Sequence, residues 1–169
     1  MSYMDASIRF AQEKDIATIL SLIKKKAEFD RGMSAFVGKV EADEEKIAQT
    51  LFCLQPFAAV LLAESAGEAV GFALFYYRYS SFKGQPSIWL DDLFVNTEAR
   101  KQGVGTMLLK RLGALGSHYD CSHIAWNASA NNRESVGFYR KFGAEVVDQK
   151  SAVLTFQVAS EVFEKWSSD

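Results

Sequence analysis

The sequence predicts a mixed α/β (α+β) fold, and two observations carry this prediction. The spacing of apolar residues switches several times along the chain between the period of a helix and the alternation of a strand. A glycine-bearing segment, residues 96–105, leads from a strand pattern directly into a helix pattern. The chain has 169 residues, 49% of them hydrophobic, which is enough to bury one continuous core. We therefore expect one domain over residues 1–169.

The N-terminal part is expected to form a strand and two helices. Residues 7–11 alternate between apolar and polar side chains, as a short strand does. Residues 14–29 carry apolar side chains at helical spacing, and Lys24, Lys25 and Lys26 cluster toward the helix end that favours cations. We expect this lysine run to be solvated. Residues 30–40 read as a loop, and residues 41–54 as a second helix with an acidic first turn.

The central and C-terminal parts alternate between strands and helices. Residues 57–64 and 69–79 read as a hairpin joined at Ala66 and Gly67. The remaining elements are expected, in chain order, as a strand over residues 87–95, a helix after Gly105, a strand over 123–128, a helix over 132–142, two short strands within 145–158 and a short helix over 161–166. The predicted order is βααβββαβαββ.

Composition excludes several classes of function. Nineteen basic and twenty-one acidic residues give a formal charge of −2 without an evident basic face, so we expect no nucleic-acid partner. The longest apolar run, residues 57–63, is far shorter than the about 20 residues of a membrane-spanning helix. Asp5 interrupts the place of a secretion signal, so we expect a cytoplasmic protein that does not associate with membranes. His118 and His123 lack a surrounding ligand cluster, and no metal site is expected.

The most informative segment is Arg100-Lys101-Gln102-Gly103-Val104-Gly105-Thr106. A loop that connects a strand to a helix presents unpaired backbone N–H groups and the positive end of the helix dipole to a ligand. Gly103 and Gly105 allow an anion to approach the main chain, and Arg100 and Lys101 add attraction. A phosphate-bearing ligand is implied. The alternative is that the glycines only turn the chain and begin a helix.

Two common phosphate-binding motifs do not fit this segment. A nucleotide P-loop needs a lysine after its last glycine, and Thr106 follows Gly105 here. A dinucleotide fingerprint needs a third glycine at position 108, which is Leu108.

A second group of polar residues lies about thirty residues later. Asn132, Ser135 and Tyr139 are spaced three and four residues apart and would share one helical face, opposite the apolar Phe138 and Phe142. Such a face can hydrogen-bond a ligand. The alternative is a capping asparagine, a surface serine and a half-buried tyrosine.

Together these residues resemble the acetyl-CoA site of the GNAT superfamily of N-acetyltransferases, and the predicted order of elements agrees with that fold. The segments over residues 22–30, 71–84, 89–95 and 137–144 resemble the diamine (spermidine/spermine, thialysine) N-acetyltransferase branch. The resemblance implies a GNAT fold with a central, mostly antiparallel mixed sheet. This sheet would open into a V between the strands that end near Val95 and Ala128 and would hold acetyl-CoA as co-substrate.

The resemblance also places the co-substrate contacts. Backbone amides from Gln102 to Thr106 would bind the CoA pyrophosphate, and Asn132 and Ser135 would hold the pantetheine or adenylate arm. Backbone groups of Leu93, Phe94 and Val95 would bind pantetheine and the acetyl carbonyl. The full set of implied co-substrate-binding residues is Leu93, Phe94, Val95, Arg100, Lys101, Gln102, Gly103, Val104, Gly105, Thr106, Asn132 and Ser135.

On the acceptor side, a primary amine has a pKa near 10.4, so removing its proton at neutrality costs about 4–5 kcal/mol. Asp91 lies where the resembling enzymes carry an acid that binds the amine and helps to deprotonate it, and Asp92 is its neighbour. Both aspartates stand in a strand that is expected to be largely buried, where a charge without a function is costly, and at least one of them could point into the cleft because successive strand residues face opposite ways. The alternative is a solvated carboxylate pair at the surface of the strand. Tyr139 falls where the branch places the acid that protonates the CoA sulfur.

Further acceptor-binding residues follow from the same resemblance. Phe29 and Asp30 match an aromatic and an acidic residue of the polyamine channel, and Phe82 stands where a tryptophan is common. The expected reaction is direct transfer of acetyl to a small-molecule primary amine, such as a polyamine, a diamine or a lysine-like compound, in a ternary complex. The resembling enzymes are homodimers, so a homodimer is expected. Two alternatives remain: acetylation of a protein lysine or N-terminal amine, and a non-catalytic acyl-CoA-binding module.

Overall fold

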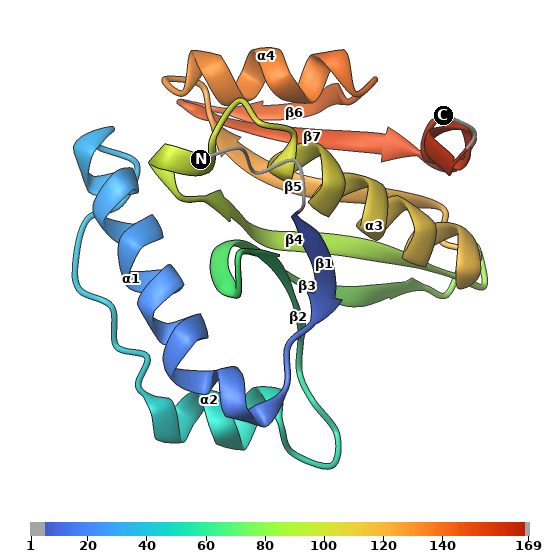
Figure 1. Cartoon of the computed structure of the whole chain (residues 1–169). Coiled ribbons are helices and arrows are strands. Elements are labelled where there is room, and N and C mark those ends of the chain that lie inside the picture. Colours follow the sequence, from blue (N-terminus) through green and yellow to red (C-terminus); the bar gives the residue numbers. More distant parts are fainter. Residues whose placement is uncertain (1–5, 168–169) are drawn as a thin grey trace. The chain divides into compact units, whose positions relative to one another are not determined.

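The computed structural model describes residues 6–167 and contains the predicted order of elements. The strands are β1 (Ser7–Phe10), β2 (Ala59–Ser65), β3 (Glu68–Ser80), β4 (Gln85–Val95), β5 (His123–Ser129), β6 (Glu145–Lys150) and β7 (Val153–Ala159). The α-helices are α1 (Ile16–Gly32), α2 (Glu44–Leu51), α3 (Val104–His118), α4 (Arg133–Lys141) and α5 (Ser160–Phe163). Short 3-10 turns cover Glu13–Asp15, Thr97–Ala99 and Glu164–Ser167. Figure 1 shows these elements.

The seven strands form one mixed, mostly antiparallel sheet in the order β1-β2-β3-β4-β5-β7-β6. The β4–β5 pair is parallel and is aligned at Ile88–Ile124 and Trp89–Ala125. The other registers, β1–β2, β2–β3, β5–β7 and β6–β7, are antiparallel. The expected α/β fold with a mixed, mostly antiparallel sheet is therefore confirmed.

The chain divides into two compact units, and β3, β4 and α3 each contain residues of both. The first unit comprises Met1–Phe75 and Asp92–Leu108, described from residue 6 onward, and the second comprises Tyr76–Asp91 and Leu109–Asp169, described as far as residue 167.

The core of the first unit lies between α1, α2 and the strands. Ile19 and Leu22 of α1 and Ile47 of α2 pack with Leu62 of β2 and Phe72 of β3, and all five are buried. Burying each such side chain contributes about 1.5–3 kcal/mol relative to exposure. Helix α1 is longer than the sequence predicted, since it continues to Gly32 through residues expected to form a loop. Helix α2 is shorter and begins after Asp43, whose carboxylate accepts the N–H of Lys46 at 2.8 Å.

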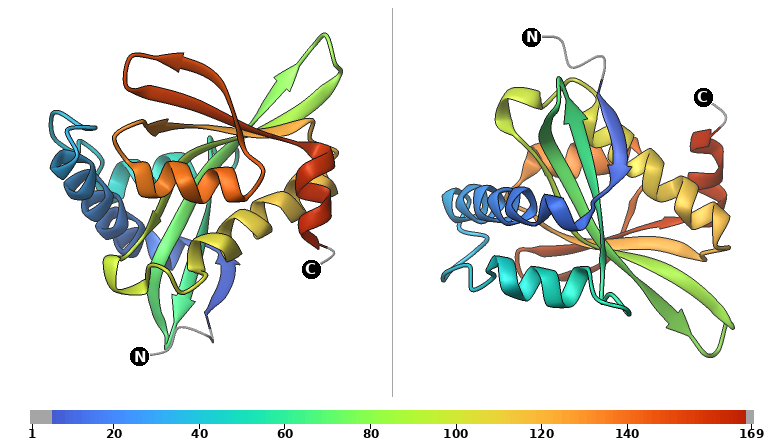
Figure 2. Two further views of the ribbon diagram at one scale, coloured as in Figure 1. Left: turned by 90° about the horizontal axis from the view of Figure 1, so that it is seen from above. Right: turned by 60° about the horizontal axis from the view of Figure 1, so that its bottom comes forward.

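The core of the second unit lies beneath α4 and along α3. The β6–β7 hairpin is seen in both views of Figure 2. Phe156 of β7 stacks on Trp126 of β5 at 5.9 Å between ring centroids. A methyl group added at Gly113 would lie 2.7 Å from the ring of Trp166, and one at Gly116 would lie 3.1 Å from Phe163. Gly113 and Gly116 of α3 therefore leave room for the aromatic rings of the C-terminal helical segment.

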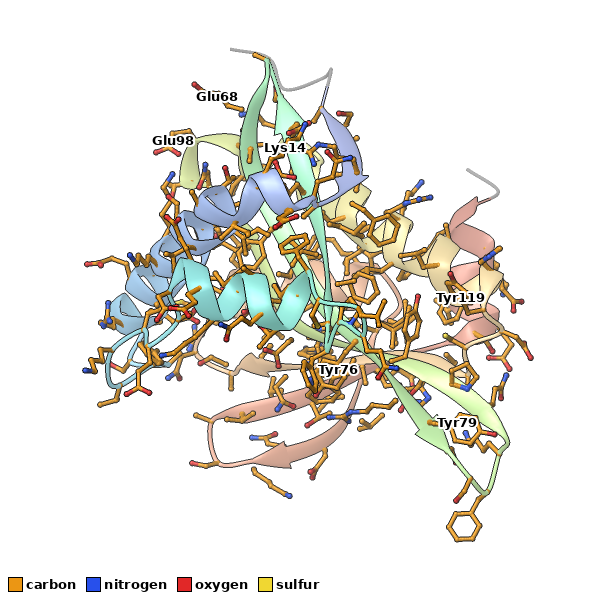
Figure 3. All side chains as sticks on the ribbon, turned by 90° about the horizontal axis from the view of Figure 1, so that it is seen from below. Lys14, Glu68, Tyr76, Tyr79, Glu98 and Tyr119 are labelled. Carbon is orange, nitrogen blue, oxygen red and sulfur yellow. The ribbon has the colours of Figure 1, made fainter. Side chains whose placement is uncertain are left out.

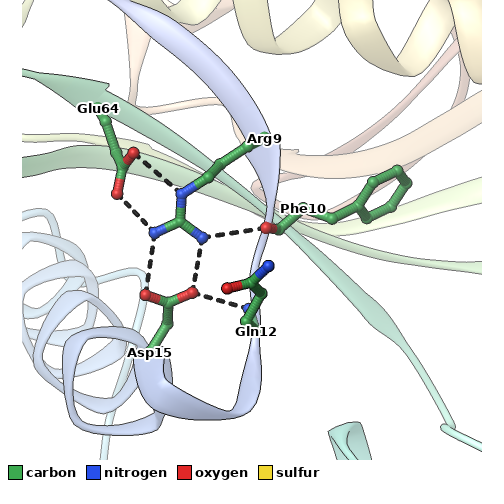
Figure 4. Close-up of polar contacts among 5 residues, drawn as sticks. All are labelled: Arg9, Phe10, Gln12, Asp15 and Glu64. Carbon is green, nitrogen blue, oxygen red and sulfur yellow. Dashed lines mark hydrogen bonds and ion pairs between the residues drawn. The ribbon is translucent and has the colours of Figure 1, made fainter.

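Arg9 joins β1, β2 and the start of α1 in the first unit (Figure 4). Its guanidinium donates to Glu64 at 2.6 and 2.9 Å and to Asp15 at 2.7 and 2.9 Å. The Asp15 carboxylate also accepts the backbone N–H of Gln12 at 2.7 Å. The side chain of Asp15 is 10% exposed and that of Arg9 is 30% exposed, so solvent screens this network only partly. Hydrogen bonds from Arg9 lower the pKa of both Asp15 and Glu64.

Replacing Arg9 with Met should lower the free energy of unfolding by about 1–3 kcal/mol at neutral pH, because two carboxylates lose their charged partner. Both carboxylates have folded-state pKa values below their ordinary 3.8 and 4.5. Their contribution is therefore complete above those values and is lost as the pH falls through the folded-state pKa values. Urea unfolding of both proteins, followed by circular dichroism from pH 7 to pH 3, should show the difference shrinking below about pH 4.

The matched control for this experiment is Lys24→Met, which removes an exposed cation of α1. It should change the free energy of unfolding by less than about 0.5 kcal/mol. If the difference in the free energy of unfolding between the wild type and Arg9→Met grew toward pH 3, the stabilising role given to the Arg9–Asp15–Glu64 network would be contradicted.

Candidate active site

The glycine-bearing segment forms a tight turn between β4 and α3, as predicted. The 3-10 turn Thr97–Ala99 follows β4, and α3 then begins at Val104, with the N–H of Met107 donating to the Gly103 carbonyl at 2.9 Å. Lys101 and Gly103 have φ values of 61° and 85°. Such values suit glycine and cost a residue with a side chain about 1–2 kcal/mol. A Cβ built on Gly103 would meet no heavy atom of the described chain within 4 Å.

The start of α3 therefore fits an anionic ligand. The N–H groups of Val104, Gly105 and Thr106 precede the first hydrogen bond of the helix and have no partner inside it. The helix dipole adds a positive potential at the same end. Gln102 stabilises the turn, since its side-chain amide donates a hydrogen bond to the Glu98 backbone carbonyl at 2.8 Å. These groups suit phosphate oxygens, and the side of Gly103 on which a Cβ would stand is open.

Arg100 has a different role from the long-range attraction that the sequence analysis gave it. Its Nε donates to the Val95 carbonyl at 3.0 Å. Its guanidinium carbon lies 4.0 Å from the ring centroid of Phe29 and 5.7 Å from that of Phe94. Cation–π contacts of this kind contribute about 0.5–2 kcal/mol each. Arg100 thus ties the end of β4 to α1 at the point where the turn begins.

The end of β4 is packed closely against β3. A Cβ added to Gly71 would lie 2.7 Å from the Phe94 carbonyl oxygen, so only glycine fits there without a backbone shift. Phe94 is buried, and its ring lies 6.4 Å from both Phe29 and Phe72. Leu93, Phe94 and Val95 all lie beyond the aligned pairs of β4 with β5, which end at Trp89.

The two aspartates of β4 differ in their surroundings. Asp91 is exposed, although the other residues of β4 are buried or half-buried, and the alternative of a solvated carboxylate therefore holds for Asp91. The side chain of Asp92 is 22% exposed, and its Oδ1 lies 3.0 Å from the Nζ of Lys26. Successive strand residues point to opposite faces, which explains why only one of the pair turns toward α1.

Lys26 was missed by the sequence analysis, which placed it in a solvated run. Lys24 and Lys25 are exposed, but the Lys26 side chain is only 24% exposed, and its Nζ also contacts Asp30 at 2.5 Å. Burial alone lowers the pKa of Lys26, but the charge of Asp92 and the hydrogen bonds to Asp30 and Asp92 outweigh it, so the pKa is raised. Lys26 stands four residues after the buried Leu22 and four before Asp30, and this spacing was the available signal.

The second polar group lies at α4. Asn132 is the N-cap residue, and its Oδ1 accepts the N–H of Ser135 at 3.1 Å. The capping alternative therefore holds for Asn132, and its side-chain NH₂ is not needed for the cap.

Within the described residues of α4, Tyr139 alone is buried, with 8% of its surface exposed. Its ring contacts Trp126 at 5.0 Å and Phe156 at 5.3 Å between centroids. The ring of Tyr139 therefore packs against the sheet, so the helical side predicted for Asn132, Ser135 and Tyr139 includes one buried aromatic ring. Phe142 instead contacts Trp166 at 5.2 Å.

Phe82 lines no pocket within the chain described. It lies in the turn between β3 and β4 and is completely exposed. Tyr79, labelled in Figure 3 on the same hairpin, is 71% exposed. These two aromatic side chains leave apolar surface at the hairpin end.

Several predicted site residues are brought together within the first unit. Phe29, Asp30, Asp92, Val95 and Arg100 form a connected group with the newly identified Lys26. The predicted residues of the second unit are Phe82, Asp91, Asn132, Ser135 and Tyr139.

Across residues 6–167 no helix combines the length and apolar character needed to cross a membrane. The same residues contain no cluster of three or more His, Cys, Asp or Glu side chains that could hold a metal ion.

Comparison with known proteins gives a consistent result. The family model described as the acetyltransferase (GNAT) family matches residues 26–144, a span that contains the glycine turn and Tyr139. The thialysine N-epsilon-acetyltransferase of Bos taurus is 30% identical over 162 residues, which cover 91% of this chain and 92% of that protein. The L-ornithine N5-acetyltransferase of Arabidopsis thaliana is 24% identical over 188 residues, covering 85% and 81%.

Solved structures share the fold. A ribosomal-protein-alanine N-acetyltransferase from Brucella melitensis superposes with a TM-score of 0.72 at 25% identity, over 90% of this chain and 99% of that one. An acetyltransferase from Salmonella typhimurium, determined with its cofactor acetyl-CoA, superposes with a TM-score of 0.69 at 19% identity over 92% and 94%.

Proposed function

We propose that this chain, which belongs to the acetyltransferase (GNAT) family, transfers an acetyl group to a primary amine of a small molecule. Family membership makes it an acetyl-CoA-dependent N-acetyltransferase. The observation that supports this site is the turn before α3. Gly103 has a φ of 85° there, and no heavy atom of the described chain lies within 4 Å of the position that a Cβ would occupy. The names of the relatives support the acceptor class, because thialysine and ornithine are small molecules with a side-chain amine.

Acetyl-CoA fits the residues present. The backbone amides from Gln102 to Thr106 would bind its pyrophosphate at the start of α3. The backbone of Leu93, Phe94 and Val95 would hold pantetheine and the acetyl carbonyl, and Arg100 fixes this strand end through the Val95 carbonyl. Asn132 and Ser135 would contact the remaining arm.

The transfer requires a neutral amine and a protonated leaving group. Asp91, exposed on β4, would bind the acceptor ammonium and accept its proton through water. The amine nitrogen then forms a C–N bond with the acetyl carbonyl carbon while the C–S bond breaks. The nitrogen releases its second proton to solvent and becomes the amide nitrogen, and Tyr139 donates its hydroxyl proton to the departing sulfur. The phenol is later reprotonated from solvent. Asp92 is less suited to the role of Asp91, because Lys26 already engages it.

One alternative has an observation in its favour. The likeness at 25% identity to a ribosomal-protein-alanine N-acetyltransferase is compatible with an N-terminal protein amine as acceptor.

The deciding experiment is a thiol-release assay with acetyl-CoA and a panel of amines. The panel contains putrescine, spermidine, lysine, thialysine and a peptide that offers an N-terminal alanine and a lysine side chain. Turnover with a small amine supports the proposal. Turnover with the peptide alone favours the protein-acetylating alternative, and CoA binding without turnover on any acceptor would identify a non-catalytic binding module.

Replacing Tyr139 with Phe should reduce kcat by about 10²-fold, the scale of a positioned general acid, and should leave acetyl-CoA affinity nearly unchanged. Steady-state kinetics and calorimetric titration measure the two quantities. The matched control is Tyr119→Phe, which alters a half-exposed tyrosine at the end of α3. Equal kcat values for Tyr139→Phe and the wild type would remove Tyr139 from the chemistry.

Replacing Gly103 with Leu should weaken acetyl-CoA binding by at least about 10²-fold, because a side chain would fill the open space beside the turn. The Gly38→Leu variant controls for backbone strain, since Gly38 also has a positive φ of 127° and no atom within 4 Å of its built Cβ. Titration calorimetry gives both affinities. Equal weakening in the two variants would contradict a specific role of Gly103.

We also expect a homodimer in which the β3–β4 hairpin takes part. The completely exposed Phe82 and the 71% exposed Tyr79 support this expectation, because a partner would remove both from water. Light scattering at micromolar concentration should give about twice the chain mass of 18.8 kDa, and Phe82→Ser with Tyr79→Ser should shift the mass toward that of one chain. A wild-type protein with the mass of one chain would refute the dimer.

A further inference from the structure

The ammonium of Lys26 is fixed between two carboxylates of the candidate acceptor side. Its Nζ lies 2.5 Å from Asp30 Oδ2 and 3.0 Å from Asp92 Oδ1. Asp30 is one turn further along α1, whereas Asp92 comes from β4, so the lysine bridges two elements of the first unit. An ammonium has three N–H donors, and these contacts occupy two of them. The side chain remains 24% exposed.

This arrangement changes the charge that an incoming amine meets. Asp30 and Asp92 without Lys26 would present two negative charges close together. With Lys26 they carry a net charge of −1, and the ammonium already uses one oxygen of each carboxylate. The ammonium of an acceptor must therefore compete with Lys26 for Asp30 and Asp92. Lys26 is part of the chain, so its binding to these carboxylates loses no translational freedom.

A second cation strengthens the effect. Arg100 lies on the ring of Phe29, the residue next to Asp30, with its guanidinium carbon 4.0 Å from the ring centroid. Phe29 and Asp30 are therefore flanked by two positive groups, Lys26 and Arg100. Such a surface disfavours a chain with several ammonium groups and favours one that also carries an anionic group.

We propose that Lys26 is a specificity-determining residue that selects acceptors carrying a carboxylate, namely amino acids with a side-chain amine, over diamines and polyamines. This inference rests on the proposed acetyl transfer to a small amine. The reacting amine loses its proton before attack, while the distant carboxylate of the acceptor pairs with the Lys26 ammonium. Asp92 directly precedes Leu93–Val95, so this cation lies beside the strand segment proposed to hold the acetyl group.

The test compares L-lysine with cadaverine, which differ only in the α-carboxylate. The measured quantity is the ratio of kcat/KM for lysine to kcat/KM for cadaverine. Lys26→Met should lower this ratio about tenfold, and Lys26→Arg, which keeps the cation, should hold it within about threefold of the wild type. Asp30→Asn removes a negative charge and should raise the ratio. Lys25→Met, an exposed neighbour on α1, is the matched control and should leave it unchanged.

The outcomes separate the inference from the proposed function. Turnover in all variants with an unchanged lysine-to-cadaverine ratio in Lys26→Met would overturn the inference alone, because a purely structural role would reduce both substrates equally. Absence of turnover with either amine in the wild type would overturn the proposed function and the inference with it. Circular dichroism checks that Lys26→Met folds. If Lys26→Met does not fold, the Asp30→Asn variant provides the test. The inference expects a higher lysine-to-cadaverine ratio of kcat/KM in that variant, and a lower ratio contradicts it.

Discussion

The hydrogen bond between Arg100 and the Val95 carbonyl is the constraint on which the site of the first unit depends. One guanidinium holds the last residue of β4, lies on Phe29 of α1 and stands at the start of the turn that begins α3. The next residues adopt positive φ values at Lys101 and Gly103, which few sequences tolerate. The turn can hold this shape because both of its ends are fixed, by Arg100 before it and by the Met107–Gly103 hydrogen bond after it.

Local patterns in the sequence were sufficient for most of the fold. The turn at Ala66 and Gly67 has positive φ at both residues, as a tight hairpin requires, and the glycine turn before α3 lies where its spacing placed it. Helix boundaries were less exact. Helix α1 continues past Asp30 to Gly32, and Lys26 and Asp30 pair across one turn of it, an interaction that the spacing of apolar residues does not reveal.

Contacts between distant segments explain what the sequence analysis could not supply. The burial of Lys26 depends on Asp92, sixty-six positions later in the chain, and no local pattern reveals that pair. The direction of Tyr139 depends on Trp126 and Phe156, which offer an aromatic surface to α4. Asn132 was assigned correctly in its capping alternative because capping is a local interaction. The candidate site was therefore predictable in its residue types and less so in its charge balance.

The placement of the aromatic rings has a practical consequence for spectroscopy. All three tryptophans of the chain, Trp89, Trp126 and Trp166, belong to the second unit, where they stack on Arg78, on Phe156 and against α3, respectively. Intrinsic tryptophan emission therefore reports on that unit alone, while far-ultraviolet circular dichroism averages over both. The two signals would follow a common curve on denaturation only if the two units lose their structure together. Comparing the signals therefore measures the cooperativity of unfolding between the two units.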